Sequence, residues 1–143
     1  LQSGTDMEDD EGNVYFNSHA WYIHLSSNEY PRLFLKQMEF DGNLNVGIMW
    51  YFGHSWATYS GQYLRDSLRT AYENSQSKLQ VVYAEGIPVE YGGKGLLGEY
   101  NTSVWDNMLQ NMNSAGAEVL VVYSIQEGLS IMERVIELKL PLK

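Results

Sequence analysis

The chain has 143 residues, 44% of them hydrophobic and 19% charged, which is enough apolar sequence to bury the core of one globular domain. Eighteen acidic residues against nine basic ones give a formal charge of −9. This charge disfavours binding to a nucleic-acid backbone and favours a soluble protein or one that docks on a basic partner. The absence of cysteine excludes disulfide scaffolds, thiolate zinc sites and cysteine nucleophiles.

Residues 1–12 are acidic and turn-prone, and we expect them to form a flexible, solvated tail in front of a single domain over residues 13–143. No apolar stretch approaches the ~20 residues of a membrane span, and no signal-peptide pattern opens the chain. The sequence therefore predicts a cytoplasmic or otherwise intracellular protein that has no membrane partner.

The segment from residue 14 to residue 52 carries β-type patterns. Aromatic and β-branched residues fill Val14–Phe16 and Trp21–Ile23, and a mixed apolar and polar segment follows at Leu33–Phe40. Asp41, Gly42 and Asn43 supply hairpin-turn chemistry before the apolar run that ends at Phe52. We interpret this part as an antiparallel β-meander.

After Ser55 the apolar period becomes helical, and five residues share one face of the predicted helix: Tyr63, Leu64, Leu68, Ala71 and Tyr72. A buried strand is predicted at Leu79–Ala84, and a glycine-rich loop at residues 85–100. A helix capped by Thr102 or Ser103 then presents an apolar face and ends near Gly116.

The apolar run Val119–Tyr123 indicates a strand covered on both faces. A last helix from about Ile125 is expected to point four residues inward: Leu129, Met132, Val135 and Ile136. The predicted fold class is therefore α+β, with an N-terminal antiparallel meander followed by alternating β/α units. Together they would form a mixed sheet with flanking helices.

The sharpest local motif is the corner Gly53-His54-Ser55, which resembles the Gly-x-Ser-x-Gly nucleophile elbow of α/β-hydrolases. Ala57 stands where that motif has its second glycine, and no histidine follows Ser55 in the chain. These departures favour a protein that is not an enzyme, and they leave the question open. Ser55 stays as a weak candidate nucleophile of a serine hydrolase and as an ordinary helix-capping residue.

Metal and cofactor motifs are missing from the sequence. His19 and His24 are an odd number of residues apart, so a regular strand would place them on opposite faces. In Gly92-Gly93-Lys94-Gly95 a glycine follows the lysine, where a phosphate-binding loop needs serine or threonine. We predict neither a metal site nor a cofactor.

Eleven tyrosines and four tryptophans are many for this length. Aromatic residues dominate the hot spots of protein interfaces, so those around the corner are candidates for a recognition surface. The leading hypothesis is a small, acidic, non-enzymatic binding domain for a protein with a basic surface, comparable to inhibitor or immunity proteins. The candidate binding residues are Trp50, Tyr51, His54, Trp56 and Tyr59.

Three segments resemble the catalytic domain of serine recombinases: Val46 to Ser55, Val82 to Ile87, and Glu118 to Ile125. They are similar to that family's strand ending in the nucleophilic serine, its Asp-Glu-Gly-Ile loop and its Val-Val-Tyr-Ser-Leu strand. The arginine that precedes the family's serine would fall on Gly53, and the run after the last strand lacks its arginines. The resemblance therefore implies a catalytically inert α/β domain.

The front half, Asn13 to Thr58, is loosely similar to the bromo-adjacent homology domain, a chromatin reader. The similarity rests on Val14-Tyr15, the Leu33–Phe40 segment taken as a strand, and Val46 to Tyr51 with its Trp-Tyr pair. This resemblance implies an acidic module that reads basic histone tails.

Overall fold

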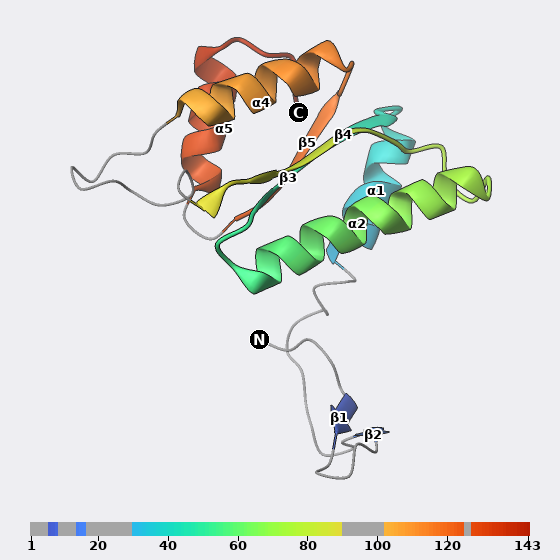
Figure 1. Ribbon diagram of the computed structural model, residues 1–143. Coiled ribbons are helices and arrows are strands. Elements are labelled where there is room, and N and C mark those ends of the chain that lie inside the picture. Colours follow the sequence, from blue (N-terminus) through green and yellow to red (C-terminus); the bar gives the residue numbers. More distant parts are fainter. Residues whose placement is uncertain (1–5, 9–13, 17–29, 90–101, 125–126) are drawn as a thin grey trace.

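The computed structural model describes residues 6–8, 14–16, 30–89, 102–124 and 127–143 (Figure 1). Two short strands, β1 (Asp6–Glu8) and β2 (Val14–Phe16), pair antiparallel. The remaining elements are, in chain order, α1 (Tyr30–Phe40), β3 (Asn45–Tyr51), α2 (Ser55–Glu73), β4 (Gln80–Ile87), α4 (Ser103–Ser114), β5 (Val119–Tyr123) and α5 (Gly128–Glu137).

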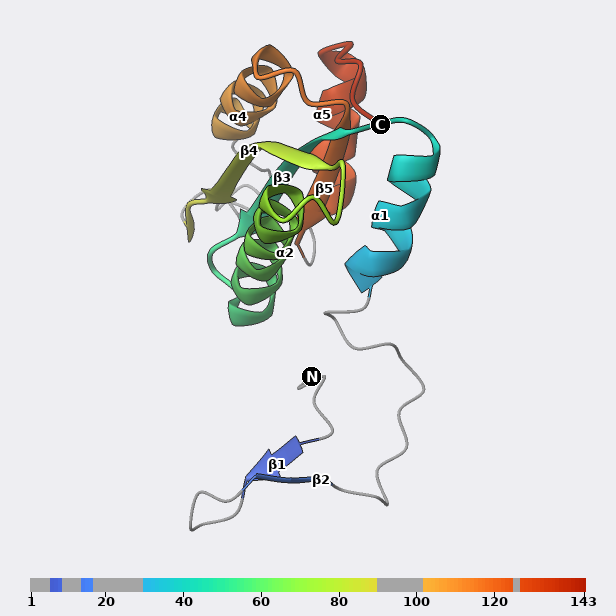
Figure 2. The same ribbon diagram turned by 90° about the vertical axis from the view of Figure 1, so that its right-hand side faces the viewer.

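The main sheet has the strand order β4-β3-β5, and both pairings are parallel. Ile48 in the middle of β3 lies opposite Ala84 of β4 and Val121 of β5. Helices α1 and α2 lie on one face of the sheet, and α4 and α5 lie on the other (Figures 1 and 2). The main body therefore has three layers.

Successive side chains of β3 point to opposite faces, so the strand supplies two hydrophobic cores. Ile48 and Trp50 pack with Leu64 and Leu68 of α2. On the other face, Met49 packs in a second cluster that includes Trp105, Leu109, Met112 and Ile131. Burial on both faces accounts for the unbroken apolar run of β3. The element order after β3, which is α2, β4, α4, β5 and α5, confirms the alternating strand and helix pattern predicted for the back half of the chain.

The antiparallel meander predicted for residues 14–52 is wrong. Residues 30–40 form α1, with Pro31 in the first turn, where proline is compatible with a helix. Leu35 and Met38, three residues apart, pack on the α2 side of the sheet, which is helical and not strand spacing. β3 is the central strand of a parallel sheet, and antiparallel pairing occurs between β1 and β2. The strand expected at Trp21–Ile23 lies outside the described residues.

Two helices bury part of the face that was expected to point inward and expose the rest: Leu64 and Leu68 of α2 and Val135 of α5 are buried as predicted. In α2 the buried residues include Leu64 and Leu68, but Tyr63 and Tyr72 are exposed. In α5 the buried residues are Ile131 and Val135, whereas three residues expected to point inward are exposed: Leu129, Met132 and Ile136. Apolar residues surround much of each helix, so the sequence pattern alone does not define the inward face.

The ends of the main helices share one backbone geometry. The second residue beyond each helix has a positive φ: 75° at Gly42, 56° at Ser75, 81° at Gly116 and 53° at Lys139. The next N–H then donates back to the last turn, as Gln76 N does to Ala71 O (2.8 Å) and Leu140 N does to Val135 O (3.1 Å). These are Schellman motifs, which favour glycine at the positive-φ position.

The start of β3 is fixed by a side chain from the start of β5. The Glu118 carboxylate accepts hydrogen bonds from Leu44 N (2.8 Å) and Asn45 N (3.0 Å). These two bonds hold the pKa of Glu118 below its usual value. On its outer edge β5 is bonded to the end of the chain, because Lys143 N donates to Glu118 O and Leu120 N donates to Lys143 O, each at 3.0 Å.

Candidate functional site

The carboxyl ends of β3 and β5 form the candidate site. The chain leaves β3 at Tyr51 towards α2 on one face, and it leaves the neighbouring β5 at Tyr123 towards α5 on the other face. Adjacent parallel strands whose connections run to opposite faces form a topological switch point. Ligand sites of open α/β sheets lie outside such points.

Close backbone contacts fix the corner between β3 and α2. A side chain on Gly53 would place its Cβ 2.1 Å from the Tyr51 ring, so glycine is the residue that fits. Thr58 N donates to His54 O (3.0 Å), and Thr58 Oγ1 donates to Tyr51 O (3.3 Å). Phe52 N donates to Ile87 O (3.1 Å), which joins the corner to the end of β4. The corner is therefore held from both strands.

The five candidate binding residues lie in three different environments. Trp50 is 3% exposed in the core between Gly61 and Gly86, with the Arg65 guanidinium 5.7 Å from the centre of its ring. Tyr51 is half-buried, and its hydroxyl lies 3.4 Å from Val89 O. Three candidates lie further along the corner: half-buried His54 and Trp56, and exposed Tyr59.

One chain of rings connects the two strands at the switch point. The His54 and Trp56 rings meet edge to face at 6.4 Å between centroids, and Trp56 meets Tyr123 in the same way at 5.9 Å. Burial raises the pKa of Tyr123 to about 12, so this residue stays a neutral phenol at physiological pH. The structure thus brings His54 and Trp56 together with a residue from β5.

Sequence reasoning did not assign Tyr123 or Glu127 to the site. Glu127 precedes α5 and is only 4% exposed, which is unusual for a carboxylate. Ser124 lies close by, because a Cβ on Gly128 would come 3.0 Å from its Oγ. The positions of these residues depend on β5 lying beside β3, and no local pattern in the sequence indicates that pairing.

The corner does not assemble the parts of a serine hydrolase among the described residues. Ser55 is the exposed first residue of α2. The histidine next to it keeps Nδ1 buried with no hydrogen-bond partner, so that nitrogen does not receive the Ser55 proton. His19 and His24 lie outside the described residues. Within the described part of the chain, no group of three or more His, Asp or Glu residues is placed to hold a metal ion.

A second feature lies on the outer surface of α2. The rings of Tyr59 and Tyr63 stack with their centroids 6.0 Å apart and their planes at 21°. They are 57% and 42% exposed and line a groove of about 490 Å³ that continues past Asp66 and Thr70. We call the residues Tyr59, Gln62, Tyr63, Asp66 and Thr70 the tyrosine face.

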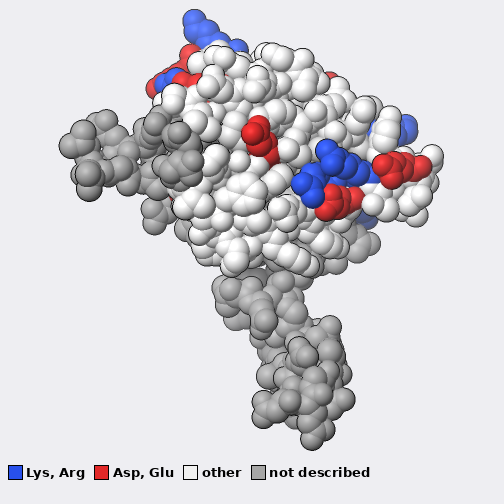
Figure 3. All heavy atoms as spheres, viewed as in Figure 1, with Lys and Arg blue, Asp and Glu red and all other residues white. Residues whose placement is uncertain are grey.

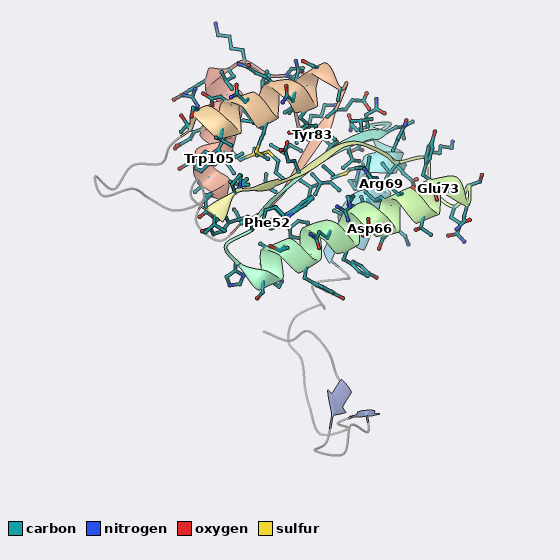
Figure 4. All side chains as sticks on the ribbon, viewed as in Figure 1. Phe52, Asp66, Arg69, Glu73, Tyr83 and Trp105 are labelled. Atoms are coloured by element: carbon teal, nitrogen blue, oxygen red, sulfur yellow. The ribbon has the colours of Figure 1, made fainter. Side chains whose placement is uncertain are left out.

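The charged side chains of α2 lie towards its C-terminal half. Figure 4 shows Asp66, Arg69 and Glu73 in a row along this helix. In the space-filling view, blue and red atoms gather over that half, while the surface over the N-terminal half is uncharged (Figure 3). Arg65 is paired with Asp66 through two hydrogen bonds of 2.8 and 3.0 Å. The N-terminal half of α2, which carries Tyr59 and Tyr63, contains no acidic residue, lysine or arginine.

Comparisons with known proteins do not place the chain in a family. No protein-family model, no curated protein and no solved structure matches it. Among the described helices, none combines the length and the apolar character needed to cross a bilayer.

Proposed function

We propose that this protein is a non-enzymatic binding domain that recognises a protein with a basic surface through its tyrosine face. The observation that carries the proposal is the stacked pair Tyr59 and Tyr63, exposed beside an open groove. Tyrosine offers a large contact area and one polar group while it loses little side-chain entropy, and it is enriched in interface hot spots. The formal charge of −9 favours a basic partner, because it speeds the encounter.

The burial of Trp50 supports a contact at the exposed tyrosines and not at this tryptophan. Trp50 packs in the core, so an exchange at this position acts on folding first. Tyr59 and Tyr63 are exposed and one helical turn apart, so replacing them removes contact area without opening the core.

The test is capture of partners from a lysate of the source cells at low and high salt, followed by mass spectrometry. The wild type is compared with Tyr59→Ala/Tyr63→Ala and with the control Tyr72→Ala, an equally exposed tyrosine on the same helix outside the groove. We expect a basic protein that the wild type and Tyr72→Ala retain and the double variant loses, with weaker retention at high salt. Equal retention of the basic protein by the wild type and both variants contradicts the proposal. So does labelling of Ser55 by a fluorophosphonate probe, because it would indicate a hydrolase.

The second candidate is a catalytically inert relative of serine recombinases. One observation favours it: the three segments that resemble that family overlap β3, β4 and β5, and the carboxyl ends of these parallel strands, Tyr51, Ile87 and Tyr123, lie at the same edge of the sheet. Gly53 leaves no space for the arginine expected two residues before the serine, because a Cβ there meets the Tyr51 ring. An inert relative leaves supercoiled plasmid uncut, and Ser55-dependent nicking would refute that interpretation.

The chromatin-reader alternative has less structural support. The Leu33–Phe40 segment, which that resemblance takes as a strand, lies within α1. Val46 to Tyr51 lies in the centre of a parallel sheet covered by helices on both faces. A histone-tail peptide array tests this alternative directly, and selective binding of one tail would support it.

A further inference from the structure

Helix α5 exposes a row of large apolar side chains on its outer side. Leu129, Met132 and Ile136 are 76%, 46% and 73% exposed. They lie at positions i, i+3 and i+7 of one helix, so they form a continuous row, which we call the α5 stripe.

The α5 stripe has no role in the core of the domain. The opposite side of the helix already supplies Ile131 and Val135 to the cluster around Trp105. Three exposed large apolar residues within ten are more than scattered surface hydrophobics and are typical of an interaction site. Their spacing is that of a helix that packs its apolar side against a partner helix.

Acidic groups border the stripe. Glu133 and Glu137 are exposed on the same helix. One nearby cation, Arg134, is occupied by Asp106 of α4 at 2.8 and 2.7 Å and is also bonded to Glu137. A second, Lys139, is exposed two residues beyond the end of α5. The formal charges of these five residues sum to −1, and the negative end of the helix dipole adds to them.

This charge arrangement selects the partner. Two copies of α5 packed about a two-fold axis would bring Glu133 towards the same residue of the other copy, and like charges oppose that contact. A helix that carries lysine or arginine beside an apolar row would cover Leu129 and Ile136 and meet the acidic border.

We infer that the outer face of α5 is a docking surface for a basic amphipathic helix of another protein. It is separate from the tyrosine face, because α2 and α5 cover opposite faces of the sheet (Figures 1 and 2). The two surfaces therefore do not overlap.

The experiment uses a fluorescent 18-residue peptide of leucine and lysine, designed as an amphipathic helix, and measures its anisotropy against the full chain. A peptide of the same composition in scrambled order controls for charge alone. The protein variants are Leu129→Ser/Ile136→Ser, which removes apolar area, and Glu133→Gln/Glu137→Gln, which removes the acidic border. Tyr72→Ala, which replaces an exposed tyrosine of α2 outside the tyrosine face, is the control on the opposite face of the sheet.

We expect the serine variant to bind the helical peptide at least tenfold more weakly and the glutamine variant to lose most of the salt dependence. The tyrosine variant should bind as the wild type does. All three replace exposed residues, and circular dichroism verifies that they fold. The inference is overturned if the serine variant stays within twofold of the wild type or if the scrambled peptide binds equally well. It is also overturned if the protein self-associates through α5 and that association excludes the peptide.

Discussion

Ser75→Gly should stabilise the protein, which is the reverse of the usual effect of glycine inside a helix. Ser75 follows α2 with a φ of 56° and donates its N–H to Tyr72 O at 3.0 Å. A residue with a Cβ is disfavoured in this conformation by roughly 1–2 kcal/mol. Glycine removes that strain but loses about 0.5–1 kcal/mol of backbone entropy on folding. The net gain should be about 0.5–1 kcal/mol.

Gly116 supplies the matched opposite case. It ends α4 with a φ of 81°, and a Cβ added there would meet nothing within 4 Å, so Gly116→Ala changes conformational preference without a clash. It should destabilise the protein by about 1 kcal/mol. Urea unfolding followed by tryptophan fluorescence measures both changes, since Trp50 and Trp105 are buried. A loss of stability in Ser75→Gly would refute the reasoning, because it would mean that Ser75 does not have a positive φ in solution.

Three further predictions concern the sheet and its cores. Trp105→Ala removes a fully buried ring and should destabilise the fold by about 3–5 kcal/mol in urea unfolding. Gly47→Ala would place a Cβ 2.2 Å from the Met112 sulfur, so we expect a loss of about 1–3 kcal/mol that Met112→Val partly restores in a double-mutant cycle. Full additivity of the two changes would argue against the contact. The pKa of Glu118 is lowered in the folded protein, so the ionised carboxylate stabilises the fold at pH values above the ordinary pKa of 4.5. This contribution disappears as the pH falls through the lowered pKa. Glu118→Gln should therefore weaken the loss of stability that urea titrations measure as the pH falls below 4.5, and parallel pH profiles of the two proteins would contradict this prediction.

The parts of the fold that the sequence could predict are those with strong local patterns. The strand at Val119–Tyr123 and the helix that contains Trp105 and Met108 are regular and end at clear turn residues such as Gly116. The direction of β3 could not be predicted in this way, because its two partners follow later in the chain and a buried apolar run fits either orientation. α1 was missed because Pro31 and short apolar stretches occur in both helices and strands.

The position of the strand-to-helix corner could be predicted from the sequence, whereas the exposure of its aromatic side chains could not. Gly53, His54 and Ser55 mark the strand-to-helix corner, which the structure places between Tyr51 and α2. The exposure of an aromatic residue in a strand depends on which face of the sheet its side chain points to, and this places Trp50 in the core. The exposure of an aromatic residue in a helix depends on which face the helix buries, and this leaves Tyr59 outside. The contact between Trp56 and Tyr123 depends on a long-range pairing that no local pattern contains.

The strand order β4-β3-β5 also affects how the protein folds during its synthesis. Among the three strands of the main sheet, β3 is synthesised first. One of its edges stays unpaired until Val119–Tyr123 have left the ribosome, about 70 residues later. At about 5–20 residues per second this takes roughly 4–14 s. During this time Met49 and its neighbours lack the cover of α4, α5 and β5, and an unpaired apolar strand can associate with other chains. The yield of folded protein should therefore depend on translation rate and on chaperones that bind the growing chain.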